Sequence, residues 1–288
     1  MDLSVITVTW NSEGLILKQI ASVQKGVGEL SYEHIIVDNA SKDATVSSIQ
    51  STYPHVQLIA NTTNNGFSAA NNQAVEKASG DFLLFLNPDM RVEPGTIATV
   101  VAWMKKHQNV GIMSPRLVDE HNNLNPDATP RRFPKLWEQL ALLFKLPHVF
   151  PKLLDKYHMT GFADTELQEV DSVRGSFLLM RRSLVLQLGW AFDPRYYIWY
   201  EDVDICREAK RLGYKVMYNP MVSCVDYVGQ SFKQRTTLWK QKQFTKSMLT
   251  YYQKWEPWYI WIWIAMCRPI GILITWAHEK ILTERSKK

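Results

Sequence analysis

Residues 82–86 constrain the fold most, because five large apolar residues in succession leave no polar face for solvent. A short strand of this kind is typical of the centre of a sheet that is covered on both sides. Asn87-Pro88-Asp89 ends it, since proline has no backbone N–H to donate to a sheet. Asp89 is therefore expected at the carboxyl end of a central strand, where open α/β sheets bind ligands and a carboxylate can hold a divalent cation. An ordinary turn is the alternative, because these three residue types also favour turns.

The N-terminal part of the chain repeats one layout of strand, polar turn and helix. Further strands are predicted at residues 3–9, 34–37 and 56–60, each followed by a helical pattern. Strands that alternate with helices predict an α/β fold with a mostly parallel sheet and right-handed crossovers. The polar residues after these strands should share one cleft, and they are residues 9–11, 38–41, 64–66 and 87–89.

Seven motifs follow one another along residues 1–231. They are VITVTWNS (5–12), VDNASKD (37–43), NNGFSAANN (64–72), GDFLLFLNPD (80–89), RGSF (174–177), FD (192–193) and YEDVDICR (200–207). In this order they resemble the inverting glycosyltransferases of family 2, and within them the bacterial rhamnosyltransferases of surface polysaccharide synthesis. The resemblance implies the GT-A fold, a Rossmann-like and mostly parallel sheet, over residues 1–231.

The first motifs imply a site for a nucleotide-sugar donor. The Trp10 indole can stack on a pyrimidine, and the Asp38 carboxylate can accept a hydrogen bond from the ring N–H of uracil or thymine. Gly66 permits close passage of the backbone near a helix N-terminus. Judged singly, Trp10 could equally well be an aromatic residue of the core, and Asp38 could equally well be a helix cap, rather than contacts of the base. The residues predicted to bind the donor are Thr9, Trp10, Asn11, Asp38, Asn65, Gly66, Asn71, Asn87 and Asp89.

The resemblance also implies a divalent cation. Asp89 matches the last residue of the family's Asp-x-Asp motif and is expected to hold Mg²⁺ or Mn²⁺ against the donor diphosphate, whereas Asn87 replaces the first aspartate. The family's histidine before a Gly-x-Ser segment is absent from residues 223–231. We therefore expect Asp226 as a further oxygen ligand, with a simple strand-end carboxylate as the alternative.

Asp202 matches the catalytic base of the family. In that role it takes the proton of the acceptor hydroxyl while the oxygen attacks the anomeric carbon from the face opposite the diphosphate, and Glu201 orients it. The alternative is an acidic first turn on a solvated helix face, with Asp204 and Arg207 paired. The residues assigned to the acceptor are Arg131, Arg174 and Gly175.

Residues 115–170 lose the rhythm of strand and helix. They place Arg131 and Arg132 before an apolar helical stretch near residues 137–149. We expect an acceptor-side insertion, because basic residues beside an apolar helix suit a lipid-linked diphosphate sugar. An inserted helix that packs on the core is the alternative.

The tail, residues 232–288, differs in composition from the rest. Residues 233–288 hold eleven basic and three acidic residues, a net charge of +8 against +5 for the whole chain, and six of the eleven tryptophans. Basic and aromatic residues around the apolar run 258–277 are typical of a membrane interface. Arg268-Pro269 divides this run into halves too short to span, so an amphipathic, monotopic tail is predicted. Since the proposed site residues precede it, truncation after Ser231 is expected to spare activity on soluble acceptors.

The sequence thus predicts a metal-dependent hexosyltransferase that moves a sugar to a lipid-linked saccharide in cell-wall or O-antigen synthesis. By the resemblance alone, L-rhamnose from dTDP-rhamnose is the first choice, with galactofuranose, glucose or N-acetylglucosamine from UDP as alternatives. A non-catalytic nucleotide-sugar-binding scaffold is the other class, favoured by Asn87 and the missing histidine. Three cysteines without metal-ligand spacing and no basic leader predict the cytoplasmic face of the bacterial inner membrane. Nucleic acid is disfavoured by the acidic main body, and a homo-oligomer is left open.

Overall fold

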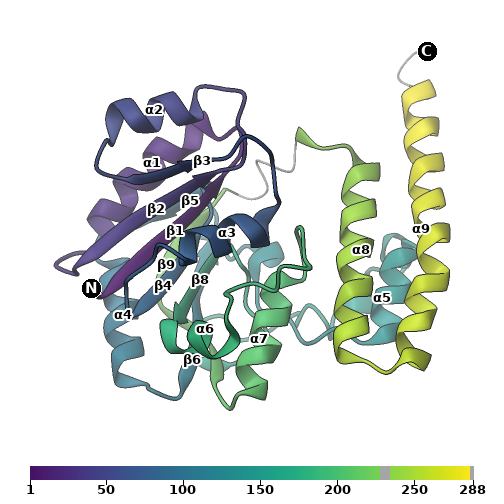
Figure 1. The fold of residues 1–288 in the computed structure, drawn as a ribbon. Helices are drawn as coiled ribbons and strands as arrows, with labels where there is room; N and C mark the ends of the chain where they lie inside the picture. Colours follow the sequence, from purple (N-terminus) through teal and green to yellow (C-terminus); the bar gives the residue numbers. More distant parts are fainter. Residues whose placement is uncertain (228–233, 286–288) are drawn as a thin grey trace.

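The computed structural model describes residues 1–227 and 234–285 (Figure 1). Its strands are β1 (Leu3–Thr9), β2 (Tyr32–Asp38), β3 (Gln57–Ala60), β4 (Phe82–Leu86), β5 (Met90–Val92), β6 (Val110–Val118), β7 (Gln168–Glu169), β8 (Phe177–Arg181) and β9 (Lys215–Asp226). Its α-helices are α1 (Glu13–Gly26), α2 (Thr45–Thr52), α3 (Phe67–Val75), α4 (Thr96–Lys106), α5 (Leu136–Leu143), α6 (Arg182–Leu188), α7 (Glu201–Arg211), α8 (Thr237–Trp255) and α9 (Trp258–Arg285). Short 3-10 helices are η1 (Pro126–Ala128), η2 (Leu146–His148) and η3 (Pro151–Leu154).

Within these described residues the strands form one nine-stranded sheet in the order β3-β2-β1-β4-β8-β6-β9-β5, with β7 paired to β9. β1, β2, β3 and β4 are parallel to one another, as the alternation of strand and helix predicted. β8 runs antiparallel to β4 and β6, and β5 and β7 run antiparallel to β9. The α/β prediction is therefore confirmed. The sheet is parallel from β3 to β4, and it contains both parallel and antiparallel pairs from β4 through β8 to β5.

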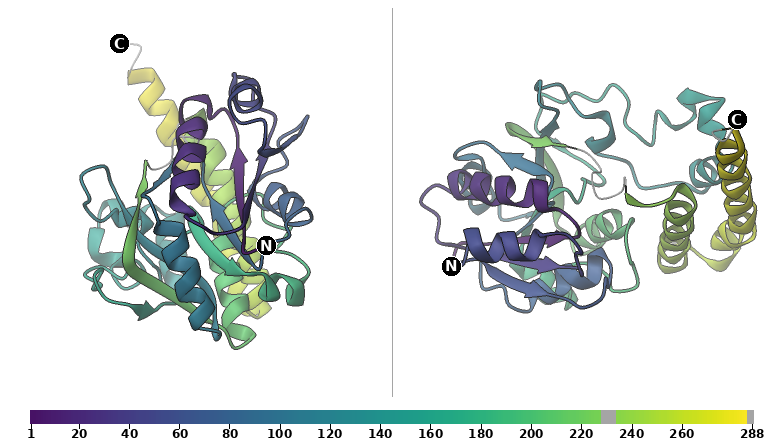
Figure 2. Two further views of the ribbon diagram at one scale, coloured as in Figure 1. Left: turned by 90° about the vertical axis from the view of Figure 1, so that its left-hand side faces the viewer. Right: turned by 90° about the horizontal axis from the view of Figure 1, so that it is seen from above.

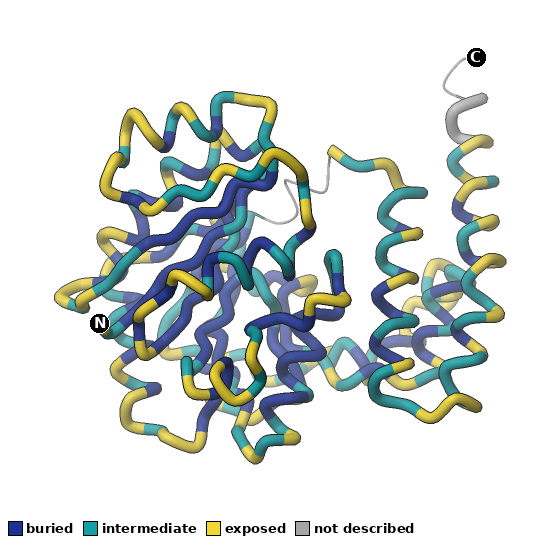
Figure 3. The backbone as a smooth tube through the Cα atoms, viewed as in Figure 1, coloured by how far each residue is buried: buried dark blue, intermediate teal, exposed yellow. Residues whose placement is uncertain are grey.

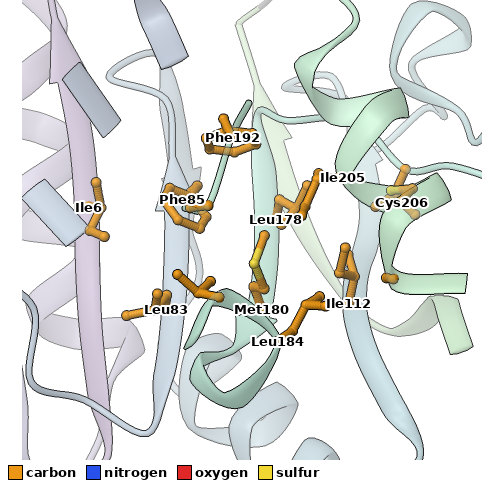
Figure 4. Packing of buried hydrophobic residues seen from close by; sticks show 14 of the residues in the cluster. Ile6, Leu83, Phe85, Ile112, Leu178, Met180, Leu184, Phe192, Ile205 and Cys206 are labelled. Atoms are coloured by element: carbon orange, nitrogen blue, oxygen red, sulfur yellow. The ribbon is translucent and has the colours of Figure 1, made fainter. Parts of the chain in front are cut away.

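β4 is buried along its whole length, which explains its apolar sequence (Figure 3). Leu83 and Phe85 enter one core cluster, whereas Phe82, Leu84 and Leu86 enter a second cluster on the opposite face. In the first cluster Phe85 packs edge-on against Phe192, with Leu178 and Ile205 close by (Figure 4). Because both faces are covered, the strand is fixed in the middle of the sheet, and its carboxyl end is a rigid platform.

The tail helices α8 and α9 form a hairpin that stands to one side of the sheet, with α5 against α9 (Figures 1 and 2). α9 runs through Pro269 without a break, so the prediction that Arg268-Pro269 divides the apolar run is wrong. Proline removes one backbone hydrogen bond, and α9 packs against both α8 and α5. Residues Trp258–Ile281 are long and apolar enough to cross a membrane.

Candidate active site

The carboxyl ends of β1 and β4 open on a cavity of about 340 Å³. Segments far apart in the sequence meet there: the turn after β4, the start of α7, the end of β9 and the start of α8. Most of the residues singled out from the sequence line this cavity. They are Thr9, Trp10, Gly66, Asn87, Asp89, Arg131, Arg174, Gly175, Glu201, Asp202 and Asp226.

Four predicted donor-binding residues do not line the cavity, and their side chains form hydrogen bonds within the protein. Asp38 is buried at the end of β2, where its carboxylate accepts hydrogen bonds from Thr9 and from the backbone N–H of Ser41. Asn71 donates to the carbonyl of Phe67 within α3. The Asn11 side chain donates to Gln234, and the Asn65 side chain accepts from Thr63. The contacts of all four residues with a donor stay predictions.

Asn64, rather than its neighbour Asn65, faces the cavity. Its Oδ1 accepts the Tyr197 hydroxyl at 2.8 Å and the Gly66 N–H at 3.0 Å. Gly66 has φ +90°, and a Cβ there would meet the Tyr197 carbonyl oxygen at 2.5 Å. Only glycine fits this close approach, so the loop after β3 is locked against the segment that precedes α7.

Asp89 and Asp226 lie in one corner of the cavity because β5 pairs with β9. In that antiparallel ladder Met90 is opposite Asp226, and the Tyr227 N–H donates to the Asp89 carbonyl at 3.1 Å. Both carboxylates are largely buried. No cluster of three or more His, Cys, Asp or Glu side chains arranged for a metal occurs among the described residues. Two hard carboxylates suit Mg²⁺ or Mn²⁺ if a diphosphate and water complete the shell.

Asp202 lies in the first turn of α7, and its carboxylate is held by backbone donors. The Val203 N–H donates to Oδ1 at 2.8 Å, and the Gly175 N–H donates to Oδ2 at 3.2 Å. Arg174 Nη1 is 4.0 Å from the same Oδ2. Since Glu201, Asp202 and Asp204 are all buried, the alternative of a solvated acidic face is excluded.

Glu201 is buried beside Asp202, and Oε2 has no hydrogen-bond partner among the described residues. Burial, together with the negative charge of Asp202, raises the pKa of Glu201 to about 8. Glu201 is therefore protonated at neutral pH and can donate a hydrogen bond. The two neighbouring carboxyl groups can therefore take different roles. Glu201 can donate a hydrogen bond, whereas Asp202, held by N–H donors, can accept a proton.

The two residues before α7 have left-handed backbone conformations, with φ +66° at Trp199 and +69° at Tyr200. Such conformations cost about 1–3 kcal/mol each in residues other than glycine, so surrounding contacts must hold them. The Tyr200 hydroxyl donates to Gln139 of α5 at 2.6 Å, and Ser247 of α8 donates to the Ile198 carbonyl at 2.7 Å. The tail and the insertion thus fix the segment that delivers the two acidic residues.

The sequence interpretation missed the part that α8 plays in the cavity wall. Arg235, Trp239 and Phe244 line the cavity, although all three belong to the segment assigned to the membrane. The Arg235 guanidinium carbon lies 4.0 Å from the centre of the Trp10 ring and 4.7 Å from that of Trp239. This cation thus lies over one face of Trp10, the side chain predicted to stack on a base. No local signal in the sequence links these residues to residue 10.

The family described as "Glycosyl transferase family 2" matches residues 4–185. The chain is 25% identical over 242 residues to the N-acetylglucosaminyl-diphospho-decaprenol L-rhamnosyltransferase of Mycobacterium tuberculosis, which covers 80% of this chain and 77% of that protein. It is 28% identical over 187 residues to the rhamnosyltransferase WbbL of Escherichia coli K12, covering 62% of this chain and 67% of WbbL.

Solved structures resemble the fold over most of the chain. The mannosyltransferase PcManGT from Pyrobaculum calidifontis, in complex with GDP-Man and Mn²⁺, superposes with a TM-score of 0.59 at 19% identity, covering 96% of this chain and 73% of that one. S. aureus TarS 1–349 in complex with UDP-GlcNAc gives a TM-score of 0.57 at 17% identity, with coverages of 87% and 65%. The predicted GT-A fold is confirmed.

Proposed function

The chain belongs to glycosyl transferase family 2, and we propose that it transfers L-rhamnose from dTDP-rhamnose to a hydroxyl of a lipid-linked saccharide, with inversion. The observation that carries this proposal is the meeting of Asp89 and Asp202, from two distant motifs, in one cavity. Relatives that are named rhamnosyltransferases support the choice of sugar. The product would enter bacterial cell-surface polysaccharide.

In the proposed reaction Asp202 accepts the proton of the acceptor hydroxyl. The N–H groups of Gly175 and Val203 hold the carboxylate in place, so that the oxygen nucleophile is oriented before it attacks. Glu201, neutral below its raised pKa, supplies a hydrogen-bond donor beside the base without adding a second negative charge. Turnover therefore needs Asp202 ionised and Glu201 protonated.

Asp89 and Asp226 are the residues that would hold Mg²⁺ or Mn²⁺. A cation bound there neutralises charge on the departing nucleoside diphosphate. Asp89 follows the rigid strand β4, so its carboxylate has a fixed position relative to the sheet. Asn87, also on the cavity wall, is uncharged and suits a hydrogen bond to the donor ribose or to water.

We also propose that α9 binds the cytoplasmic face of the inner membrane. One side of the helix exposes large apolar side chains at alternating spacings of four and three residues, here called the α9 stripe: Tyr259, Trp263, Met266, Ile270 and Leu273. The other side, with Ile264 and Thr275, is buried against neighbouring helices. A helix that packs one side on the protein and exposes a continuous row of large apolar side chains on the other suits a lipid surface. Lys242 and Lys246, exposed on α8, can attract anionic lipid.

A donor panel tests the proposal. The full-length protein is incubated with a lipid-linked saccharide and, in turn, dTDP-rhamnose, UDP-galactofuranose, UDP-glucose and UDP-N-acetylglucosamine, with Mn²⁺ or with EDTA. We expect a product carrying one added rhamnose, formed from dTDP-rhamnose and dependent on Mn²⁺. Transfer of a different sugar would replace the donor assignment. Donor binding without transfer or hydrolysis in every arm would support a scaffold.

A further inference from the structure

Two arginines meet at the end of the cavity that contains the base. The backbone of Arg131 forms a pair of hydrogen bonds with Ser172, N to O at 3.1 Å and O to N at 3.0 Å. Ser172 lies two residues before Arg174, and both arginine side chains line the cavity. Arg174 Nη1 is 4.0 Å from Asp202 Oδ2, so this cationic end adjoins the position of the reacting hydroxyl.

The Arg131 guanidinium contacts neutral groups directly, and the negative charge of Asp202 acts on it without forming a salt bridge. Its guanidinium lies 5.7 Å from the centre of the Tyr157 ring, and Nη2 donates to the Asp127 carbonyl at 3.4 Å. Among the described residues the salt bridge at this end of the cavity joins Asp202 to Arg174 and not to Arg131. Burial, and then the positive charge of Arg174, lower the pKa of Arg131. The two arginines share one carboxylate, Asp202, so their positive charge exceeds the negative charge beside them, and a bound anion would balance it.

Asn125 supplies a second, independent indication of a ligand. It is 7% exposed and lines the same cavity. Its Oδ1 accepts the Asp127 N–H at 3.0 Å, which fixes the orientation of the amide. Its Nδ2 has no hydrogen-bond partner among the described residues. A buried N–H donor left unpaired calls for an acceptor, and phosphate oxygens accept from amide and guanidinium donors alike.

We propose that Asn125, Arg131 and Arg174 bind the diphosphate of the acceptor, which lies one sugar residue from the hydroxyl that reacts. The assignment rests on the proposed function. In an inverting displacement the base and the departing diphosphate are on opposite sides of the anomeric carbon. An anion site that adjoins Asp202 therefore belongs to the acceptor, whereas the donor diphosphate lies toward Asp89 and Asp226.

The short distance from Arg174 to Asp202 sets the size of the acceptor. A saccharide whose anomeric carbon carries the diphosphate can present a hydroxyl to Asp202 only if few sugar rings intervene. The enzyme then extends a lipid diphosphate that carries a single sugar. The preceding reaction must be one that transfers a sugar 1-phosphate to a lipid phosphate.

Acceptor kinetics with matched arginine variants test this assignment. The acceptors are a polyprenyl diphosphate carrying one N-acetylglucosamine and the uncharged alkyl glycoside of the same sugar. Arg131→Met should raise KM for the diphosphate acceptor at least tenfold, with a much smaller effect on kcat/KM for the alkyl glycoside and no effect on KM for the donor. The control is Arg132→Met, because Arg132 is exposed and does not line the cavity. Equal losses on both acceptors, or a raised donor KM, would overturn the assignment.

A binding measurement keeps the test independent of turnover. Inorganic pyrophosphate, added in EDTA so that no divalent cation can hold it near Asp89, should raise the melting temperature of the wild type and of Arg132→Met. Arg131→Met should lose this stabilisation, and Arg131→Lys, which keeps the charge, should retain part of it. Equal stabilisation of wild type and Arg131→Met, or none in the wild type, would contradict the site. If no nucleotide sugar in the donor panel reacts, the proposed function is refuted. The stabilisation by pyrophosphate does not depend on that outcome.

Discussion

Lys254 Nζ lies 2.6 Å from Asp204 Oδ2, and it also contacts Asp193 at 3.0 Å and Glu208 at 2.9 Å. One cation of α8 is thus surrounded by three carboxylates, two of them on α7. Further arginines neutralise the outer carboxylates, Arg195 on Asp193 and Arg211 on Glu208. Because α7 begins with the two acidic residues of the active site, the tail helix α8 is part of the frame that holds them.

Replacing the central cation should destabilise the fold. Lys254→Met leaves three carboxylates with two cations, and Asp204 is then buried without its lysine. Breaking a buried ion pair from one side should lower the free energy of unfolding by roughly 3 kcal/mol. Denaturant unfolding measures this. Lys246→Met, on the exposed side of α8, should change it by less than about 0.5 kcal/mol, and equal effects of both variants would contradict the structural role of the cluster.

The raised pKa of Glu201 predicts how stability changes with pH. The folded protein keeps the proton up to about pH 8, whereas the unfolded chain loses it near pH 4.3. Relative to Glu201→Gln, whose amide does not titrate, the wild type should lose stability as the pH rises from about 4.3 to about 8 and then level off. Melting temperatures of both proteins across this range test the sign. Parallel curves would show that Glu201 titrates normally.

The same group predicts the alkaline side of the activity profile. Wild-type turnover should fall above about pH 8, where Glu201 ionises beside Asp202. Glu201→Gln keeps a neutral donor at this position and should lack that decline. Initial rates as a function of pH, with saturating donor and acceptor, give the comparison. A decline at the same pH in both proteins would assign it to another group.

The two carboxylates near β5 should differ in their effect on donor binding. Asp89→Ala should abolish the part of donor affinity that depends on Mn²⁺, and Asp226→Ala should reduce it by less. Titration calorimetry with and without Mn²⁺ measures both. Asp127→Ala is the control, since it removes the same charge from another part of the cavity wall. Unchanged affinity in Asp89→Ala, or an equal loss in all three variants, would contradict the metal assignment.

The α9 stripe predicts where membrane affinity resides. Trp263→Gln combined with Ile270→Gln removes two exposed apolar side chains, each contributing about 1.5–3 kcal/mol when buried in lipid, so vesicle binding should weaken by more than about a hundredfold. Flotation with anionic vesicles measures it. Leu186→Gln, an exposed apolar residue on α6, should float like the wild type. Equal flotation of the double variant would remove the stripe from this role.

The sequence predicted those features that depend on short segments. The apolar run predicted strand β4, and the proline predicted that the strand ends before Asn87. Both are where they were expected. The sequence singled out Asn65, whereas its neighbour Asn64 lines the cavity, because the side that a loop residue faces is set by its tertiary contacts, here with Tyr197. The donor contact of Asn65 stays a prediction.

The contribution of the tail could not be predicted in this way. Arg207, which the alternative of a solvated helix face paired with Asp204, bonds Glu256 and Tyr251 at the end of α8, while Asp204 bonds Lys254. These pairs join residues about fifty positions apart, and no periodicity links them. Their positions also change the expectation for truncation after Ser231: the cut removes Arg235, Trp239 and Lys254, so we now expect loss of activity on soluble acceptors as well.

Turnover by Asp202→Asn tests the central claim most directly. The variant keeps the size of the side chain and an oxygen that can accept the Gly175 N–H, so we expect wild-type donor affinity and melting temperature. Transfer of rhamnose from dTDP-rhamnose to the lipid-linked acceptor, followed by mass spectrometry, should be at least about a hundredfold slower than in the wild type. Near wild-type transfer by this variant would show that Asp202 is not the base.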